Sequence, residues 1–472
     1  MKKWIFGLGM GLCLLTACGG GANKEEAKEN SQTATEAAKA ADKQEGKKDG
    51  FSGKITFTYR DNGTAKEKMG LYRWVTAAYE TWEHKDEVEL DIAPITASEG
   101  DYFTKIALQL ADPSTCPDLV CEDTFQLPND AAAGYLTDLT SYLKEYDEWD
   151  QYYESMQSIT SVEGVCYGVP YCTDTRGLFY NRGVLEKAGV VQVGEDWEPK
   201  SWDDILSACQ KIKDSDPDVI PFWCNSGKAT GEATSMQTYE MLLYGTGEKL
   251  LDEDGKWIVE SQGIKDSLEF IQNIYKKGYG PSLDLVLTGQ GGLNAEREYL
   301  PSGKLGILLD GLWITAPWKE EGAAPWKNYD KECGLAAMPT NKGQAPGTVT
   351  LSGGWALSLP ENGDNKDATF DFVKHMMSEK NYLDLVLFEG DICTRKDIAE
   401  KEEYKAQPFF EFGTKLLDTA GYRPQNDLYS SVSTGIQEMV ESVVTGTSID
   451  DAISQYAANT ASIVGDDNVV KK

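Results

Sequence analysis

Segments patterned as strands and as helices alternate from residue 54 onward, and this alternation most limits how the chain can fold. Residues 54–59 place apolar side chains at every second position, as a half-buried strand does, whereas residues 71–82 place them at helical spacing. Residues 88–92 alternate again, and residues 103–110 return to helical spacing before a short apolar run at 118–121. This succession predicts an α/β sheet with parallel crossovers.

The second half of the chain continues the pattern. Ser201 is predicted to cap a helix, because Asp204 stands three residues later in the capping-box position. Residues 264–274 form another helix face, and residues 304–309 form a buried strand. The last stretch, residues 436–461, is predicted to be one amphipathic helical segment.

The first residues have the pattern of a bacterial export signal. Two lysines precede an apolar stretch, residues 4–17, which is too short to span a bilayer comfortably. This stretch runs into Leu-Thr-Ala-Cys at residues 15–18, which resembles the lipobox of bacterial lipoproteins. The resemblance implies that residues 1–17 are removed and that Cys18 is lipidated, which would anchor the protein to the membrane. The alternative is an ordinary secretory signal with incidental cysteines.

Small and polar residues fill positions 19–50, with no large apolar side chain to bury. Such a composition predicts a flexible, solvated tether, so residues 18–50 are interpreted as lipidated cysteine and linker. The remaining 51–472 exceed the roughly 250 to 300 residues at which a single core stops growing. We therefore expect two lobes, and no second apolar segment approaches spanning length.

The formal net charge is −32, and loss of the two lysines with the signal makes it −34. Because this charge repels phosphate backbones, nucleic-acid binding is not expected, and solubility is the preferred explanation. The chain has two histidines and no C-x-x-C pair, so neither a zinc site of ordinary spacing nor any other metal site is expected. The cysteines beyond the tether are expected to be mostly buried free thiols: Cys116, Cys121, Cys166, Cys172, Cys209, Cys224, Cys333 and Cys393.

Enzyme motifs are scarce in this sequence. Residues 289–292 are glycine-rich but do not follow a predicted strand, so they are no dinucleotide fingerprint. No P-loop, nucleophile elbow or zincin motif occurs. A carboxylate pair such as Glu122 and Asp174 could in principle cleave glycosides, but an acidic chain offers many such pairs by chance. We therefore expect a protein that is not an enzyme and that holds no cofactor.

Candidate binding residues follow the predicted strands, because open α/β sheets bind ligands beyond the carboxyl ends of their strands. Flat aromatic faces suit the C–H side of a sugar, and carboxylates or arginines suit its hydroxyls. For each tryptophan, core packing is the alternative. The candidates selected in this way are Arg60, Asp61, Glu122, Asp123, Trp223, Asp310, Trp313 and Trp355.

Several segments in order resemble the extracellular solute-binding protein family 1, of which maltodextrin-binding proteins are familiar members. The resemblance covers nearly everything after the tether. The segments that carry it are Gly-Val-Cys-Tyr-Gly-Val-Pro (164–170), Leu-Phe-Tyr-Asn (178–181), Leu-Glu-Lys-Ala-Gly (185–189), Pro-Lys-Ser-Trp-Asp-Asp (199–204), Gly-Lys-Leu-Gly through Gly-Leu-Trp (303–313), Gly-Leu-Ala-Ala-Met-Pro (334–339), Ser-Gly-Gly-Trp (352–355) and Gly-Thr-Ser-Ile-Asp-Asp-Ala (446–452).

The resemblance implies a two-lobed fold like that of periplasmic binding proteins, with a hinge between the lobes and a ligand cleft at their interface. It places chain crossings near residues 172–174, 337–340 and 392–395. The implied lobes are 51–172 with 340–393, and 173–339 with 394–472. Carried over to this sequence, the ligand contacts include Trp313, Asp174, Glu122, Asp123 and Tyr429, with Leu312 departing from the proline usual before the stacking tryptophan. Arg395, at the end of the third implied crossing, is a further candidate ligand contact.

The predicted function is that of a monomeric, extracytoplasmic, lipid-anchored protein that binds a small ligand and hands it to the permease of an ABC importer. Abundant aromatic and acidic candidates, with few basic residues near them, favour a neutral sugar over an anion. A non-sugar solute remains an alternative, as does a surface adhesin or sensor. An extracellular glycan-processing enzyme is the alternative from another class, and it would turn over sugar.

Overall fold

The computed structural model describes residues 50–97 and 99–472. The predicted signal peptide, Cys18 and nearly all of the predicted tether lie outside the described residues. Within the described part of the chain, no helix is both long and apolar enough to cross a membrane.

A five-stranded sheet, called the first sheet below, has the order β3-β1-β5-β16-β8. Strand β1 pairs in parallel with β3 and β5, whereas β16 is antiparallel to both β5 and β8. The sheet is therefore mixed, although the predicted strands and parallel crossovers at its start are confirmed. Its strands are β1 (Gly53–Thr58), β3 (Val88–Ile92), β5 (Leu119–Asp123), β8 (Val169–Cys172) and β16 (Trp355–Ser358).

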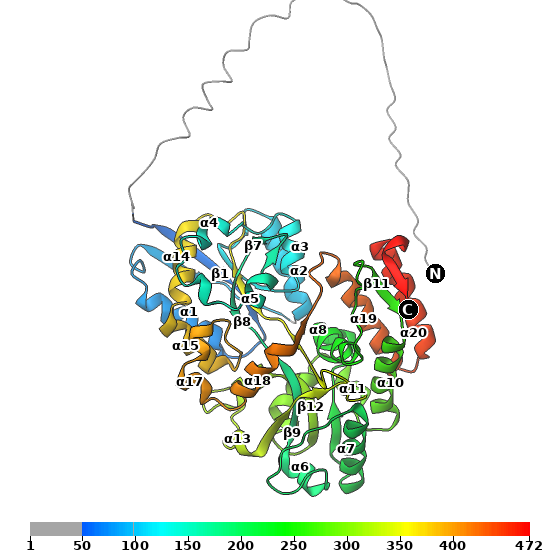
Figure 1. The fold of residues 1–472 in the computed structure, drawn as a ribbon. Coiled ribbons are helices and arrows are strands. Elements are labelled where there is room, and N and C mark those ends of the chain that lie inside the picture. Colours follow the sequence, from blue (N-terminus) through cyan, green and yellow to red (C-terminus); the bar gives the residue numbers. More distant parts are fainter. Residues whose placement is uncertain (1–49, 98) are drawn as a thin grey trace, which may run out of the picture. The chain divides into compact units, whose positions relative to one another are not determined.

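Three helices pack together beside the first sheet: α1 (Gly70–Thr81), α14 (Lys366–Met376) and α15 (Glu379–Glu389) (Figure 1). The apolar stripe predicted for the first of them buries Trp74 and Val75. The indole Nε1 of Trp74 donates to the carbonyl of Met376 at 3.1 Å, which joins α1 to the far end of α14. Helix α1 is thus held by a segment 302 residues later in the chain.

A second sheet has the order β10-β12-β9-β13. Here β10 and β12 are parallel, and β9 runs antiparallel to its neighbours β12 and β13. The capping box predicted at Ser201 is present at the start of α7. The elements are β9 (Arg176–Asn181), β10 (Ile220–Trp223), β12 (Leu305–Gly311) and β13 (Cys333–Ala336), with α6 (Arg182–Lys187), α7 (Trp202–Ser215) and α10 (Gln262–Lys276) around them.

The chain passes between the two sheets three times. Residues 173–175 join β8 to β9, and the chain returns to β16 through β14 (Met338–Pro339) and β15 (Thr348–Ser352). A third strand, β17 (Ala420–Tyr422), pairs with β15, so β14, β15 and β17 form a linking sheet. The third crossing lies between Ile392, which is bridged to Thr173 in the first crossing, and β17. Its predicted position at 392–395 stays a prediction. The lobe limits drawn from the sequence stay a prediction.

The helical segment predicted for residues 436–461 is two helices, α19 (Tyr429–Val444) and α20 (Ile449–Val464). Gly446 between them has a φ of 115°, which a helix does not accommodate. The side chain of Ser448 then caps α20 by accepting from the backbone N–H of Asp451. The apolar periodicity continues across the break, so it did not reveal the turn.

Shorter elements complete the chain. Two of them, η4 and η5, are π-helical and line the cleft described below. The remaining elements are β2 (Arg60–Asp61), η1 (Lys66–Lys68), β4 (Ile95–Thr96), α2 (Glu99–Ala111), α3 (Leu127–Ala132), α4 (Thr140–Leu143), η2 (Trp149–Gln151), α5 (Glu154–Ile159), β6 (Ser161–Val162), β7 (Val165–Cys166), η3 (Lys228–Thr230), α8 (Glu232–Thr234), η4 (Ser235–Glu240), α9 (Met241–Gly245), β11 (Trp257–Glu260), α11 (Leu283–Val286), α12 (Gly291–Asn294), η5 (Ala295–Tyr299), η6 (Leu312–Trp318), α13 (Tyr329–Glu332), α16 (Lys396–Ala399), α17 (Glu402–Lys405), α18 (Phe410–Leu416), η7 (Leu417–Thr419), η8 (Asp466–Asn468) and β18 (Val469–Lys471).

The eight cysteines beyond the tether are free thiols in the structure, and all except Cys116 are buried. Burial raises the pKa of several of these thiols, for example that of Cys224 to about 12. A buried thiol with a raised pKa is a poor nucleophile, because the thiolate is the reactive form.

Substitution of Gly354, just before β16, tests how closely the first sheet packs against the first crossing. It has a φ of 137°, and a Cβ on it would lie 2.1 Å from the carbonyl oxygen of Cys172. Because the obstacle is backbone, Gly354→Ala is expected to lower the free energy of unfolding by more than about 1 kcal/mol. Gly100→Ala, on an exposed helical position with open space around it, is the control and should change little. Equal urea midpoints for the two variants would contradict this account.

Candidate functional site

A cleft of about 700 Å³ lies between the ends of the two sheets. One wall contains Cys121 and Asp123 from the carboxyl end of β5. The opposite wall contains Asp310 near the carboxyl end of β12 and Asn225 just beyond β10. The cleft therefore lies where open α/β sheets hold ligands.

Trp313 lies on the wall of the second sheet, at the start of η6 immediately after β12. Its ring covers Gly311, where an added Cβ would lie 1.9 Å from the indole, so only glycine leaves room for this ring position. The guanidinium carbon of Arg176 lies 4.9 Å from the ring centroid. Trp313 is half-buried and is thus held from two sides while still facing the cleft.

Trp355 lies on the wall of the first sheet, where β16 begins. Its neighbours across the strands are Asp123 on β5 and Cys172 on β8. The ring stacks on Phe103 with centroids 6.0 Å apart and an interplanar angle of 18°. The two walls therefore each contribute one half-buried tryptophan to the lining.

Asp174 and Arg176 lie at the base of the cleft, where the chain crosses from β8 to β9. Their side chains form a buried ion pair. Asp174 also accepts from the backbone N–H of Gly353 at 3.2 Å, and Arg176 donates to the carbonyl of Leu351 at 3.0 Å. The pair thus ties the first crossing to the second, and the Nε of Arg176 is left without a protein partner.

Arg423 is a cleft residue that the sequence analysis missed. It follows β17, and its guanidinium reaches Asp123 at 2.7 Å and Glu232 at 3.1 Å. No motif marks Arg423 or Glu232, and the three residues are brought together only by the third crossing. Their meeting could have been found in the sequence only if the short strand β17 had been recognised.

The π-helical segments η4 and η5 each turn two side chains into the cleft: Met236 and Gln237, and Glu296 and Arg297. Extra residues in a helical turn commonly occur at functional sites, and sequence periodicity does not reveal them. The Oε1 of Gln237 is buried without a protein partner. These segments therefore supply polar lining that the strand-end rule did not predict.

Glu296 and Asp310 form an acidic pair on the second wall. Burial raises the pKa of Asp310 to about 7. Burial, together with the nearby Asp310 carboxyl, raises the pKa of Glu296 to about 8, although Arg297 donates to Glu296 at 2.9 Å. Near neutral pH both groups are therefore substantially protonated and can donate hydrogen bonds as well as accept them.

The lining carries more positive charge than the sequence led us to expect. The prediction of few basic residues near the candidates is wrong, because the fold brings distant arginines to the cleft. Acidic side chains still outnumber basic ones among the lining residues. The basic ones are Arg60, Lys68, Arg176, Arg297 and Arg423, and the acidic ones are Asp123, Asp174, Glu232, Glu296, Asp310, Glu389 and Asp391.

Of the predicted binding residues, Asp123, Asp174, Asp310, Trp313 and Trp355 line the cleft. Arg60, which the strand-end rule also selected, lines it as well. Contact of any of them with a ligand stays a prediction.

Two predicted residues lie behind the cleft wall instead of on it. Trp223 is fully buried in the core, and its Nε1 donates to Asn225 at 3.4 Å. Glu122 points to the other face of β5 from its neighbour Asp123, as alternate strand residues do, and it is buried. Burial, and next the adjacent carboxyl of Asp130, raise the pKa of Glu122.

Three further predicted residues also lie outside the lining. Arg395 is 1% exposed, and its guanidinium is taken up by Glu148 at 2.6 Å and Asp397 at 2.5 Å. Asp61, at the end of β2, accepts from the backbone N–H of Gly63 and from the hydroxyl of Thr96 on the neighbouring strand β4. Tyr429 is buried behind the cleft, where its hydroxyl oxygen lies 2.9 Å from a carboxyl oxygen of Glu232 and 2.6 Å from one of Glu240.

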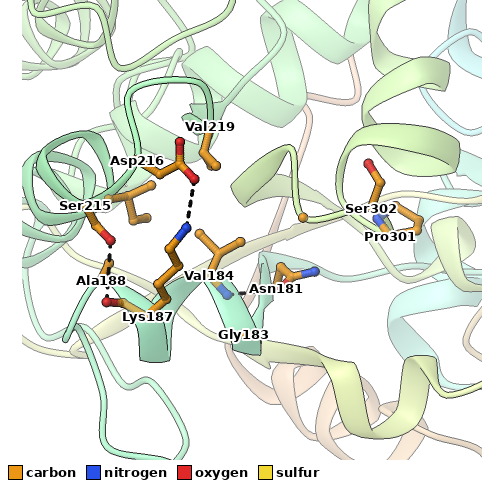
Figure 2. Close-up of a pocket in the computed structure, with 12 residues that line it drawn as sticks. Asn181, Gly183, Val184, Lys187, Ala188, Ser215, Asp216, Val219, Pro301 and Ser302 are labelled. Carbon is orange, nitrogen blue, oxygen red and sulfur yellow. Dashed lines mark hydrogen bonds and ion pairs between the residues drawn. The ribbon is translucent and has the colours of Figure 1, made fainter.

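A second, smaller hollow of about 300 Å³ lies at the other end of the second sheet's strands, beside α6 and α7 (Figure 2). Its polar groups already have protein partners. Lys187 and Asp216 form an ion pair at 2.9 Å, and the amide of Asn181 caps α6 through the backbone N–H of Val184. Nothing in this hollow points to a ligand.

The described residues contain no group of three or more His, Cys, Asp or Glu side chains arranged to hold a metal ion.

The chain is similar to curated relatives in sequence and to solved structures in fold. A binding protein of Brucella abortus (strain 2308) is 23% identical over 407 residues, which are 80% of this chain and 93% of the relative. Maltose-bound MalE3 of T. maritima superposes with a TM-score of 0.75 at 24% identity, covering 88% of this chain and all of the other. An ABC transporter solute-binding protein from Thermotoga lettingae TMO with bound α-D-tagatose gives the same TM-score, identity and coverage.

These likenesses show the fold, and the predicted two-lobed α/β fold of periplasmic binding proteins is confirmed. The model of the bacterial extracellular solute-binding protein family matches residues 67–382. This match spans more than half of the chain and includes segments that line both walls of the cleft. The chain therefore belongs to the bacterial extracellular solute-binding protein family.

Proposed function

We propose that this protein is the extracytoplasmic sugar-binding component of an ABC importer and that it binds a saccharide in the cleft between the two sheets. The observation that carries the proposal is the placement of Trp313 and Trp355, one on each wall, among carboxyl and guanidinium groups. Aromatic faces suit the apolar side of a sugar ring, and the polar groups suit its hydroxyls. Relatives of similar fold have been solved with maltose and with tagatose.

The mechanism is a shift in population between two arrangements of the lobes. A ligand that touches both walls favours the arrangement in which the walls are close, by the free energy of the contacts made only there. The linking sheet of β14, β15 and β17 is the place where the lobes would move against each other. No covalent step is part of this proposal, and the permease would recognise the ligand-bound arrangement.

The ligand class is tested by a thermal-shift screen with maltose, maltotriose, cellobiose and tagatose, followed by calorimetry on each compound that raises the melting temperature. Binding to the folded state alone raises stability by RT ln(1 + [L]/Kd). Chromatography of the same incubations separates binding from hydrolysis. Released product would favour a glycan-processing enzyme, and stabilisation by amino acids or glycerol phosphate instead of sugars would favour another solute.

Replacing Trp313 by Ala should weaken binding of the sugar found in the screen by about tenfold or more, equal to about 1.4 kcal/mol. The melting temperature of the unliganded variant should fall less than that of Trp223→Ala, because Trp223 is wholly buried and its truncation costs about 3 to 5 kcal/mol. Affinity by calorimetry and melting temperature are measured for both variants. Unchanged affinity in Trp313→Ala would remove this residue from the site.

Small-angle scattering should show that the saturating sugar reduces the radius of gyration of residues 51–472. The contraction follows if the walls approach each other around the ligand. Trp313→Ala at a subsaturating sugar concentration is the matched control and should contract less. Identical profiles with and without a sugar shown by calorimetry to saturate the protein would contradict the proposed closure.

Membrane attachment is proposed to depend on Cys18, from the lipobox-like residues 15–18. Cys18→Ser should move the protein from the detergent phase to the aqueous phase in Triton X-114 partitioning, because no acyl chain can then be added. Cys13→Ser, within the predicted signal, is the control and should remain in the detergent phase. Equal partitioning of wild type and Cys18→Ser would refute the anchor.

A further inference from the structure

Arg423 joins the two walls of the cleft directly. Arg423 is 6% exposed, and its guanidinium makes ion pairs to Asp123 at 2.7 Å and to Glu232 at 3.1 Å. Asp123 belongs to the first sheet, at the end of β5, whereas Glu232 opens α8, which lies in the chain between β10 and β12 of the second sheet. One buried cation thus bridges a carboxylate from each side.

Glu232 is fixed firmly on the side of the second sheet. Its carboxylate accepts from Tyr429 at 2.9 Å, from Ser235 at 3.1 Å and from the hydroxyl of Ser433. Tyr429 and Ser433 lie on α19, which packs against α10 and α20. The bond between Arg423 and Glu232 therefore stays within one side of the cleft.

Asp123 is fixed on the side of the first sheet. Its residue pairs with Trp355 across β5 and β16, and its carboxylate accepts from the backbone N–H of Phe125 at 3.1 Å. The Phe125 ring also lies 4.5 Å from the guanidinium carbon of Arg423. The contact of Arg423 with Asp123 and Phe125 is accordingly the part of this cluster that separates when the walls separate.

The space that Arg423 occupies is shaped for it. A Cβ on Gly353 would lie 2.7 Å from a guanidinium nitrogen of Arg423, so a side chain there would displace the arginine. Arg423 itself follows directly after β17 of the linking sheet. Its position is therefore set at the point where the proposed motion between the lobes would be centred.

We propose that Arg423 is a positioning residue that holds the two walls of the cleft together before any ligand is bound and so sets how much of the closing the ligand must drive. The inference rests on the lobe motion of the proposed function. If the lobes are already held together, the ligand has to supply less free energy from contacts made only in the closed arrangement. Its apparent affinity rises with the fraction of protein that is closed before binding.

Other contacts also join the two sides, among them the hydrogen bond that Ser430 on α19 donates to Gln126 at 3.0 Å. Two further contacts differ in exposure from the contact of Arg423 with Asp123, which is called the tie below. Arg73 pairs with Glu321 at 2.8 Å, and Lys68 donates to the carbonyl of Gly322 at 3.0 Å. The side chains of Arg73 and Glu321 are 40% and 68% exposed, so salt screens this pair. The Arg423 cluster is buried, so the tie should persist at a salt concentration that weakens the rim.

The test measures the radius of gyration of unliganded residues 51–472 by small-angle scattering in 0.5 M NaCl. Asp123→Asn and Arg423→Gln should each enlarge it. The double variant should enlarge it no further than the larger single effect, because both changes break one contact. Arg423→Lys, which keeps the charge but cannot hold both carboxylates in the same fork, should fall between wild type and Arg423→Gln.

Arg182→Gln is the matched control. It removes an ion pair of 2.7 Å to Asp196 that lies on the second sheet's side alone, so it should leave the radius of gyration unchanged. Circular dichroism checks that each variant is folded. If Arg423→Gln does not fold, Asp123→Asn decides the question, since it removes a charge from the tie and keeps the shape of the side chain.

Wild-type radii in folded Asp123→Asn and Arg423→Gln would overturn the tie. The sugar experiment separates this failure from failure of the proposed function. A wild type that contracts with sugar, beside variants that do not expand, leaves the function standing without the tie. If the variants expand but no tested sugar binds the wild type, the tie is supported and the proposed sugar-binding function is not.

Discussion

The position of β16 between β5 and β8 is the constraint on which the rest of the structure depends. In the sequence, this strand follows all four strands of the second sheet. It completes the first sheet by antiparallel pairing on both sides. Because β16 lies between β5 and β8, the residues just before it run close to the first crossing. There Gly354 lies against the backbone of Cys172. The same register places Trp355 beside Asp123 and Cys172, and so fixes one wall of the cleft.

Charge in the cleft is organised as internal pairs. Arg176 is matched with Asp174, and Arg423 is matched with Asp123 and Glu232. Breaking a buried ion pair leaves an unpaired charge with the full free-energy cost of desolvation. The paired side chains therefore keep their orientation. The paired groups present fixed donors and acceptors to a ligand, which suits recognition of hydroxyls better than capture of a single charge.

The sequence predicted the regular elements well where one face is clearly apolar, as in β1, α1 and α10, or where nearly the whole strand is apolar, as in β12. It failed where local pattern and tertiary context differ. The rule that ligand contacts follow the predicted strands selected both Glu122 and Asp123. Neighbouring strand residues face opposite sides of a sheet, and only Asp123 lines the cleft. Trp223 also follows the rule, yet its ring packs against Gly291 in the core, a partner 68 residues away.

By itself, the sequence determined that this chain is an α/β protein, and the ordered motifs indicated its family. Those features depend on local periodicity and on short segments, which a linear chain carries directly. Tertiary structure alone decided which polar side chains share the cleft. Asp123, Glu232 and Arg423 come from three segments separated by up to 300 residues, and they meet because three crossings bring the two sheets and the linking sheet together.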